Sequence, residues 1–160
     1  MTISIGDRLP AVTIRKMGAN GPEEICTNDL FAGEKAVLFA VPGAFTPTCS
    51  MKHVPGFVQH ADEIKAKGVT MIACMSVNDA YVMDAWGKEL KVNTAVEMLA
   101  DGSAELTKAL GLELDLTVRG LGIRCKRFAM VVEDGVVTLL NIEESGKFDI
   151  SKAESVLAAL

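Results

Sequence analysis

The sequence lacks the residue spacings that metal centres and paired-thiol sites require. It contains only two histidines, and its four cysteines, at positions 26, 49, 74 and 125, include no Cys-x-x-Cys pair. These separations match no zinc-binding pattern, so a metal cluster and a dithiol–disulfide exchange site are both disfavoured. A chain of this size can build a core without disulfide staples. Free thiols indicate a reducing compartment such as the cytoplasm.

Positive charge and long apolar runs are scarce as well. The 16 lysines and arginines are outnumbered by 21 acidic residues, and the net charge is −5. A nucleic-acid surface usually needs the opposite sign. No apolar run approaches the roughly 20 residues that span a bilayer, and Met1 to Asp7 has no signal- or transit-peptide character. We therefore expect neither nucleic acid nor a membrane as a partner.

The composition is that of an ordinary globular protein. Hydrophobic residues make up 49% of the chain and charged residues 23%, which is unlike a disordered sequence. No internal repeat, low-complexity segment or long linker divides the chain. We therefore expect residues 1–160 to form one domain with a single core.

Apolar periodicity predicts an alternation of strands and helices along the chain. Strands are expected at 11–15, 24–27, 35–41, 69–77, 96–100, 127–132 and 136–142, and helices after position 46 to 67, at 80–90, at 104–110 and from 151. Residues 119–123 are expected to form a loop. This order predicts an α/β, thioredoxin-like fold, with a largely parallel but mixed central sheet, helices on both faces and an N-terminal β-hairpin.

Local signals predict several helix boundaries. Asn78 and Asp79 are expected to cap the helix that follows them, and Gly111 is expected to end the helix before it. Ser151 and Glu154 have the spacing of a capping box. Pro55 is expected to kink or break the helix in which it falls.

The stretch around Cys49 carries the strongest functional signal. An apolar strand ends just before it, Thr46 is a good N-cap, and Pro47 suits the first helical position. Cys49 would then lie in the first turn, where unpaired N–H groups and the helix dipole favour a thiolate. Most cysteines are small buried hydrophobes, but this position is typical of a reactive nucleophile.

The motif residues resemble the type II (atypical) peroxiredoxins, in particular the plant and bacterial branch. The resemblance rests on residues 42–50, 52–57, 76–79, 99–102 and 127–132. It implies a peroxidase that reduces hydrogen peroxide and alkyl hydroperoxides without a bound cofactor. The family motif Pro-x-x-x-Thr-x-x-Cys falls on Pro42, Thr46 and Cys49, and its distant arginine falls on Arg127, with Arg124 as a nearby alternative.

The chemistry explains why these residue types are needed. A thiolate at Cys49 would attack one oxygen of the peroxide while the other oxygen leaves, and the cysteine would become a sulfenic acid. Backbone N–H groups, the Thr46 hydroxyl and the Arg127 guanidinium would stabilise the developing charge. Pro42 would shield the site from water. His53 follows Cys49 on the same helix face, and we expect it to have a packing or hydrogen-bonding role.

The second thiol of the reaction is expected to come from outside the chain. In some relatives a cysteine near the chain end resolves the sulfenic acid, but residues 146–151 contain none. Cys74 lies in an apolar strand, which favours an inert core thiol over a resolving one. The resemblance therefore implies one-cysteine turnover with glutathione and glutaredoxin, or with thioredoxin.

Two further expectations concern partners. The same sequence would suit a redox relay that passes oxidation to other proteins, which is the alternative to a peroxidase. The resemblance also implies a homodimer formed through loops around the active site. Phe45 and the segment Gly120–Gly122 are the expected contacts.

Overall fold

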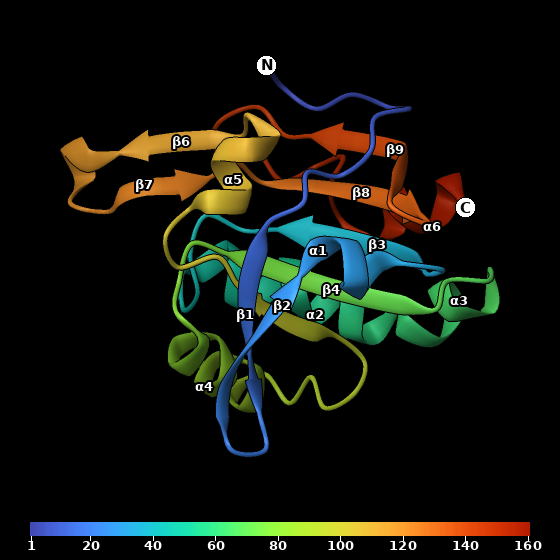
Figure 1. The fold of residues 1–160 in the computed structure, drawn as a ribbon, viewed down its shortest axis with the longest axis horizontal. Coiled ribbons are helices and arrows are strands. Elements are labelled where there is room, and N and C mark those ends of the chain that lie inside the picture. Colours follow the sequence, from blue (N-terminus) through green and yellow to red (C-terminus); the bar gives the residue numbers. More distant parts are fainter.

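A seven-stranded mixed sheet forms the centre of the protein in the computed structural model, which describes all residues 1–160 (Figure 1). The strand order is β2-β1-β5-β4-β3-β8-β9. The strands are β1 (Thr13–Gly18), β2 (Gly21–Cys26), β3 (Lys35–Ala40), β4 (Met71–Ser76), β5 (Glu97–Ala100), β8 (Phe128–Glu133) and β9 (Val136–Ile142). The thioredoxin-like α/β class and the mixed sheet are confirmed.

The parallel part of the sheet is smaller than the sequence pattern predicts. Only the pairs β3–β4 and β4–β5 are parallel. The N-terminal hairpin β1–β2 forms as predicted, and β1 then pairs antiparallel with β5. The hairpin β8–β9 pairs antiparallel with β3. The prediction of a largely parallel sheet is therefore wrong, because both hairpins join the central strands in the reverse direction.

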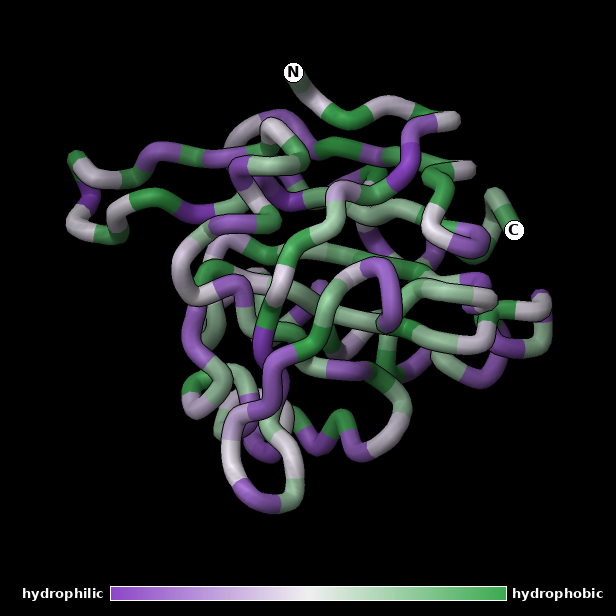
Figure 2. The backbone as a smooth tube through the Cα atoms, in the orientation of Figure 1, coloured by the Kyte–Doolittle hydropathy of each residue, from purple (hydrophilic) through white to green (hydrophobic).

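Helices cover both faces of the sheet, as predicted. They are α1 (Thr27–Phe31), α2 (Val54–Gln59), α3 (Ala61–Ala66), α4 (Ala80–Glu89), α5 (Glu105–Leu110) and α6 (Ala153–Ala159). Side chains from α2, α3, α4 and α6 pack on one face, and those from α1 and α5 pack on the other. Hydrophobic residues concentrate on the central strands (Figure 2). None of the helices has the length and apolar character to cross a bilayer.

Alternation along β3 divides the core between these two faces. Val37 and Phe39 point to the side of α2 and α4, whereas Ala36 and Leu38 point to the side of α1 and α5. Every one of these side chains is fully buried. A strand that is covered on both faces has a continuous run of apolar residues in its sequence, which is why β3 could be predicted.

A second, two-stranded sheet was not predicted. The strands β6 (Glu113–Leu116) and β7 (Gly122–Cys125) pair antiparallel and project from the side of the molecule (Figure 1). The short 3₁₀-helix Thr117–Arg119 joins them. The predicted loop is only the tip of this hairpin. Its strands have four residues each and half-exposed side chains, too short a pattern for periodicity to reveal.

The helix after Thr46 contains a π-helical turn at Cys49–His53, in which the N–H of Val54 donates to the carbonyl of Cys49. Pro55 is the second residue of α2, directly after this π-helical turn. The helix does not end at Pro55, but its hydrogen-bond pattern changes from π-helical to α-helical immediately before it. The helical run ends at Gln59, and His60 separates α2 from α3.

Two of the three predicted helix caps form. The carboxylate of Asp79 accepts from Val82 N, and Gly111 ends α5 with a φ of 71°, in the left-handed region. The capping box at Ser151 is wrong. The N-cap of α6 is Lys152, without a side-chain cap, because both donors of Ser151 bind the carboxylate of Glu143 instead.

Replacing Asp101 by Ala should destabilise the protein much more than replacing Asp79 by Ala. The Asp101 carboxylate accepts from Leu106 N, Thr107 N and Thr107 Oγ1, all buried. Removing this carboxylate leaves buried donors without an acceptor, and we expect the free energy of unfolding to fall by about 3 kcal/mol. Asp79→Ala removes one exposed cap, at about 1 kcal/mol. Equal losses in urea unfolding would contradict the buried-donor argument.

Candidate active site

Cys49 lies where the chain leaves the central strand β3 and turns into a helix. The helix begins at Pro47, so Cys49 is in its first turn and opens the π-helical segment. N–H groups at this point of a helix have no intrahelical partner. A π-turn inside an α-helix is frequently found at functional sites. Cys49 is only 1% exposed, so its thiol is buried in this structure.

The guanidinium of Arg127 reaches the sulfur of Cys49. Its Nη2 donates to Cys49 Sγ at 3.2 Å, and its Nη1 lies 2.8 Å from His53 Nδ1. The charged group also lies over the ring of Phe148, 5.6 Å from the ring centroid. Arg127 immediately precedes β8, which pairs with β3. This pairing brings together two residues that are 78 positions apart.

Arg124, the alternative in the sequence, is engaged elsewhere. Its Nε donates to the carbonyl of Leu121 at 2.8 Å, and its Nη1 lies 3.3 Å from the carbonyl of Val77. The structure therefore places Arg127 at the sulfur, while Arg124 connects Leu121 of the β6–β7 hairpin to Val77, just after β4.

His53 is a neutral acceptor for Arg127. Its Nε2 lies 3.0 Å from the carbonyl of Ser151, which can only accept, so Nε2 carries the proton and Nδ1 accepts from Arg127. Burial, together with the charge of Arg127, lowers the pKa of His53 to about 3. The imidazole is therefore uncharged at neutral pH. The expected hydrogen-bonding role is confirmed, but sequence reasoning did not identify Arg127 as the partner.

The loop before the helix is held by short hydrogen bonds. The Thr46 hydroxyl donates to the carbonyl of Gly43 at 2.7 Å. Asn78, at the end of β4, accepts from Ala44 N at 3.0 Å. Thr46 stands at the N-cap position, and its carbonyl accepts from Ser50 N, but its hydroxyl does not cap the helix. In that one respect the prediction for Thr46 is wrong.

A cleft of about 430 Å³ lies next to Arg127. Its lining includes Pro42, Thr48 and Arg127, and also the basic side chains of Lys126 and Lys147. Cys49 does not line the cleft itself, but Arg127 both lines it and contacts the sulfur of Cys49. Pro42 is half-buried.

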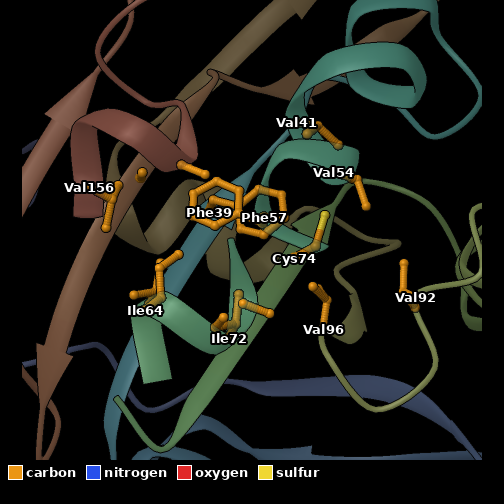
Figure 3. Close-up of a cluster of buried hydrophobic side chains, with 14 of the residues drawn as sticks. Phe39, Val41, Val54, Phe57, Ile64, Ile72, Cys74, Val92, Val96 and Val156 are labelled. Carbon is orange, nitrogen blue, oxygen red and sulfur yellow. The ribbon is translucent and has the colours of Figure 1, made fainter. Parts of the chain in front are cut away.

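The other three cysteines lie away from any such arrangement. All four thiols are free. Cys74 is fully buried among Phe39, Phe57 and Val54 (Figure 3), and burial raises its pKa well above the ordinary value. Burial also raises the pKa of Cys125 to about 12. Cys26 is half-buried at the end of β2.

Comparisons with known proteins show the family of this chain. The family model described as Redoxin matches residues 4–157. Peroxiredoxin-2B of Arabidopsis thaliana is 52% identical over 159 residues, which cover 99% of this chain and 98% of that protein. The chain belongs to the peroxiredoxin family. As a peroxiredoxin it is a thiol-dependent peroxidase.

Two further relatives support the assignment. Chloroplastic Peroxiredoxin-2E of Arabidopsis thaliana is 52% identical over 163 residues, covering 99% of this chain and 70% of that protein. The crystal structure of reduced Prx3 from Vibrio vulnificus in complex with H₂O₂ is 51% identical, with a TM-score of 0.96 and 99% of each chain covered. Peroxiredoxin chemistry uses a hydroperoxide as substrate and a thiol as reductant.

Residues behind Arg127 were missed by sequence reasoning. Glu143, Phe148 and Ser151 surround His53 and Arg127. They come from the end of β9 and the segment before α6, about a hundred positions from His53, and no local pattern connects them. The only available signal was the placement of His53 four residues after Cys49, on the same helix face.

The stability of this peroxiredoxin should depend on His53 in weakly acidic solution. The pKa of His53 is about 3 in the folded protein and about 6.5 in the unfolded chain. Below pH 6.5 the unfolded chain therefore binds a proton that the folded protein does not. Stability is lost as the pH falls from 6.5 towards 3, by up to about 1.4 kcal/mol per pH unit from this group.

We expect His53→Gln to remove this slope. Denaturant unfolding of the wild type and the variant between pH 7 and pH 4 measures it, because acidic groups contribute equally to both. The stability difference between the two proteins should narrow by about 3 kcal/mol on going to pH 4. Parallel curves would contradict a neutral, buried His53.

Proposed function

We propose that Cys49 is the peroxide-reducing nucleophile of this peroxiredoxin and that Arg127, Thr46 and Pro42 assist it. The observation that supports this most directly is the 3.2 Å contact of Arg127 Nη2 with Cys49 Sγ at the start of a helix. A guanidinium beside sulfur favours the thiolate, and only the thiolate is nucleophilic. Arginine keeps its charge at any relevant pH.

The first step is a displacement on oxygen. The Cys49 thiolate attacks the hydroxyl oxygen of the hydroperoxide, so that an S–O bond forms while the O–O bond breaks. The other oxygen leaves as hydroxide or alkoxide and takes a proton from water. Sulfur loses two electrons and the peroxide gains them, which leaves a sulfenic acid on Cys49 and releases water or an alcohol.

Each assisting residue has a separate role in this step. Arg127 donates towards the oxygens as negative charge moves onto the leaving oxygen. The Thr46 hydroxyl donates a hydrogen bond to the carbonyl of Gly43, so its oxygen is free to accept a hydrogen bond from the O–H of the hydroperoxide. Pro42, which lines the cleft next to Arg127, has no N–H and limits the access of water to the sulfur.

We propose that the sulfenic acid is resolved by a thiol from outside the chain. Cys74 and Cys125 are both fully buried with raised pKa values, so neither supplies a thiolate. Cys26 lies at the end of β2, a strand at the far edge of the sheet from β8. A one-cysteine mechanism fits these positions.

Glutathione acting with glutaredoxin is the reductant that suits the cleft best, with thioredoxin as the alternative. Glutathione is anionic at neutral pH, and the cleft next to Arg127 is lined by Lys126, Arg127 and Lys147 as well as by two glutamates. Its thiolate attacks the sulfenic sulfur, forming a mixed disulfide and releasing water. A second glutathione, through glutaredoxin, restores the Cys49 thiol and leaves with the first as a disulfide. This turnover suits a reducing compartment such as the cytoplasm.

Replacing Cys49 by Ser should abolish hydroperoxide consumption, while replacing Cys74 by Ser should leave it intact. We expect less than about 1% of wild-type turnover for Cys49→Ser, because the hydroxyl is a far weaker nucleophile. Consumption of hydrogen peroxide with glutathione and glutaredoxin, and separately with thioredoxin, measures both variants. Loss of turnover in Cys74→Ser with every reductant would contradict the one-cysteine mechanism.

We further propose that the protein forms a homodimer through the edge of the active site. Phe45 is 55% exposed although it is aromatic, and its backbone is held at a φ of 63°, an unusual conformation for a bulky residue. Leu121, at the tip of the β6–β7 hairpin, is 41% exposed, and Val118 beside it is fully exposed. Arg124 links the two regions, since it bonds Leu121 and packs against Gly43.

Introducing charge at this edge should separate the dimer. The wild type is expected to have about twice the chain mass of 17.0 kDa in sedimentation equilibrium. We expect Val118→Asp combined with Leu121→Asp to give the mass of one chain, since charge is depleted in interface cores. Ile5→Asp, at another exposed apolar residue, is the control. A wild-type monomer, or a variant dimer, would contradict this interface.

A further inference from the structure

A buried carboxylate holds the chain segment that packs against Arg127. Glu143, at the end of β9, is 7% exposed. Its Oε2 accepts from Asp149 N at 2.6 Å, Ser151 N at 2.9 Å and Ser151 Oγ at 2.7 Å. Burial alone raises the pKa of Glu143, but hydrogen bonds from Ser151, Asp149 and Ile150 lower it below its ordinary value. The group is therefore a charged acceptor at neutral pH, and it fixes the segment that leads into α6.

The fixed segment in turn controls His53. The carbonyl of Ser151 accepts from His53 Nε2, so the proton stays on that nitrogen and Nδ1 faces Arg127 as an acceptor. Phe148, in the same segment, has its ring 5.0 Å from the imidazole and 5.6 Å from the guanidinium carbon. A continuous series of contacts thus runs from Glu143 to the sulfur of Cys49.

We propose that Glu143 is a positioning residue for peroxide reduction, which acts through Ser151 and His53 to aim the guanidinium of Arg127 at Cys49. The proposal rests on the roles proposed above for Cys49 and Arg127. Glu143 does not touch the sulfur, and no ion pair joins it to Arg127. Its effect is transmitted by the orientation of two buried groups.

The effect of Glu143 on the orientation of Arg127 depends on which ring nitrogen of His53 carries the proton. Without Glu143, the two donors of Ser151 lose their acceptor, and the Ser151 carbonyl is no longer held over the imidazole. The proton of His53 is then free to move to Nδ1, where an N–H would face the N–H of Arg127 Nη1. Two facing donors repel, and the guanidinium turns away from the position in which Nη2 donates to sulfur.

The backbone adds a second link between Glu143 and Arg127. The N–H of Glu143 donates to the carbonyl of Arg127 at 2.9 Å. This bond does not depend on the Glu143 side chain, so a substitution there preserves the strand pairing. Side-chain variants therefore test the carboxylate itself rather than the end of the sheet.

The test is the second-order rate constant for oxidation of Cys49 by hydrogen peroxide in stopped flow. Trp86 provides the signal, since its indole Nε1 donates to Ser50 Oγ next to Cys49. We expect Glu143→Ala to lower the rate constant by about tenfold or more, as is typical when a group that orients an active-site ligand is removed. Glu143→Gln keeps one acceptor oxygen and should lower it by about threefold.

Two matched controls separate this effect from loss of charge and from loosening of the segment. Glu144→Ala removes the same charge from the neighbouring, exposed position. Ser155→Ala removes another anchor of the segment, the hydrogen bond to the Asp149 carbonyl at 3.0 Å, which is not on the path to His53. Both controls should stay within about twofold of the wild-type rate constant. A tenfold loss in either of them would overturn the assignment to Glu143.

The deciding comparison repeats both Glu143 variants in a protein that carries Arg127→Gln. If Glu143 acts through Arg127, neither variant lowers the rate constant further there, because contacting residues are not additive. The same fold-loss with and without Arg127 would overturn the proposal, and Glu143→Gln serves this purpose if Glu143→Ala does not fold. Comparing the rate constants of the wild type, Cys49→Ser and Arg127→Gln tests the roles of Cys49 and Arg127 without any Glu143 variant, so the two failures are distinguishable.

Discussion

The contact between one guanidinium and one sulfur organises the candidate active site of this peroxiredoxin. Arg127 divides its donors between Cys49 Sγ and His53 Nδ1, and a planar fork can satisfy both acceptors only from a narrow range of positions. The strand pairing of β3 with β8 sets the distance between the two elements. Uncharged His53 matters as much as the sulfur, because a protonated imidazole would repel the arginine.

The fold supplies this contact by placing the end of a buried strand next to the start of a helix. β3 is covered on both faces, so its end is fixed by packing from two cores. The π-turn at Cys49–His53 then puts the cysteine and the histidine on the side that faces β8. The thiol therefore follows a strand that is packed on both faces, and a fixed charge stabilises a transition state best when its position is held by such packing.

The features of the fold that could be predicted from the sequence are those that local patterns determine. The strand β3, the helix start at Pro47 and the position of Cys49 depend on apolar runs and a short motif, and these could be predicted. Arg127 was assigned only through the resemblance to the peroxiredoxins. The mixed direction of the sheet depends on where hairpins dock, which no local pattern encodes. Ser151 was misread as a helix cap, because its spacing to Glu154 is correct while its actual partner, Glu143, is known only after folding.

The sequence separation of the paired groups has a consequence for biosynthesis. Cys49 contacts Arg127 across 78 positions, and His53 contacts Ser151 across 98. Such distant pairs form late, after the chain entropy of long loops has been overcome. A ribosome-bound chain that has emerged only to β5 displays the cysteine without the arginine. The contact between the guanidinium and the thiol therefore forms only after β8 has been synthesised and has paired with β3.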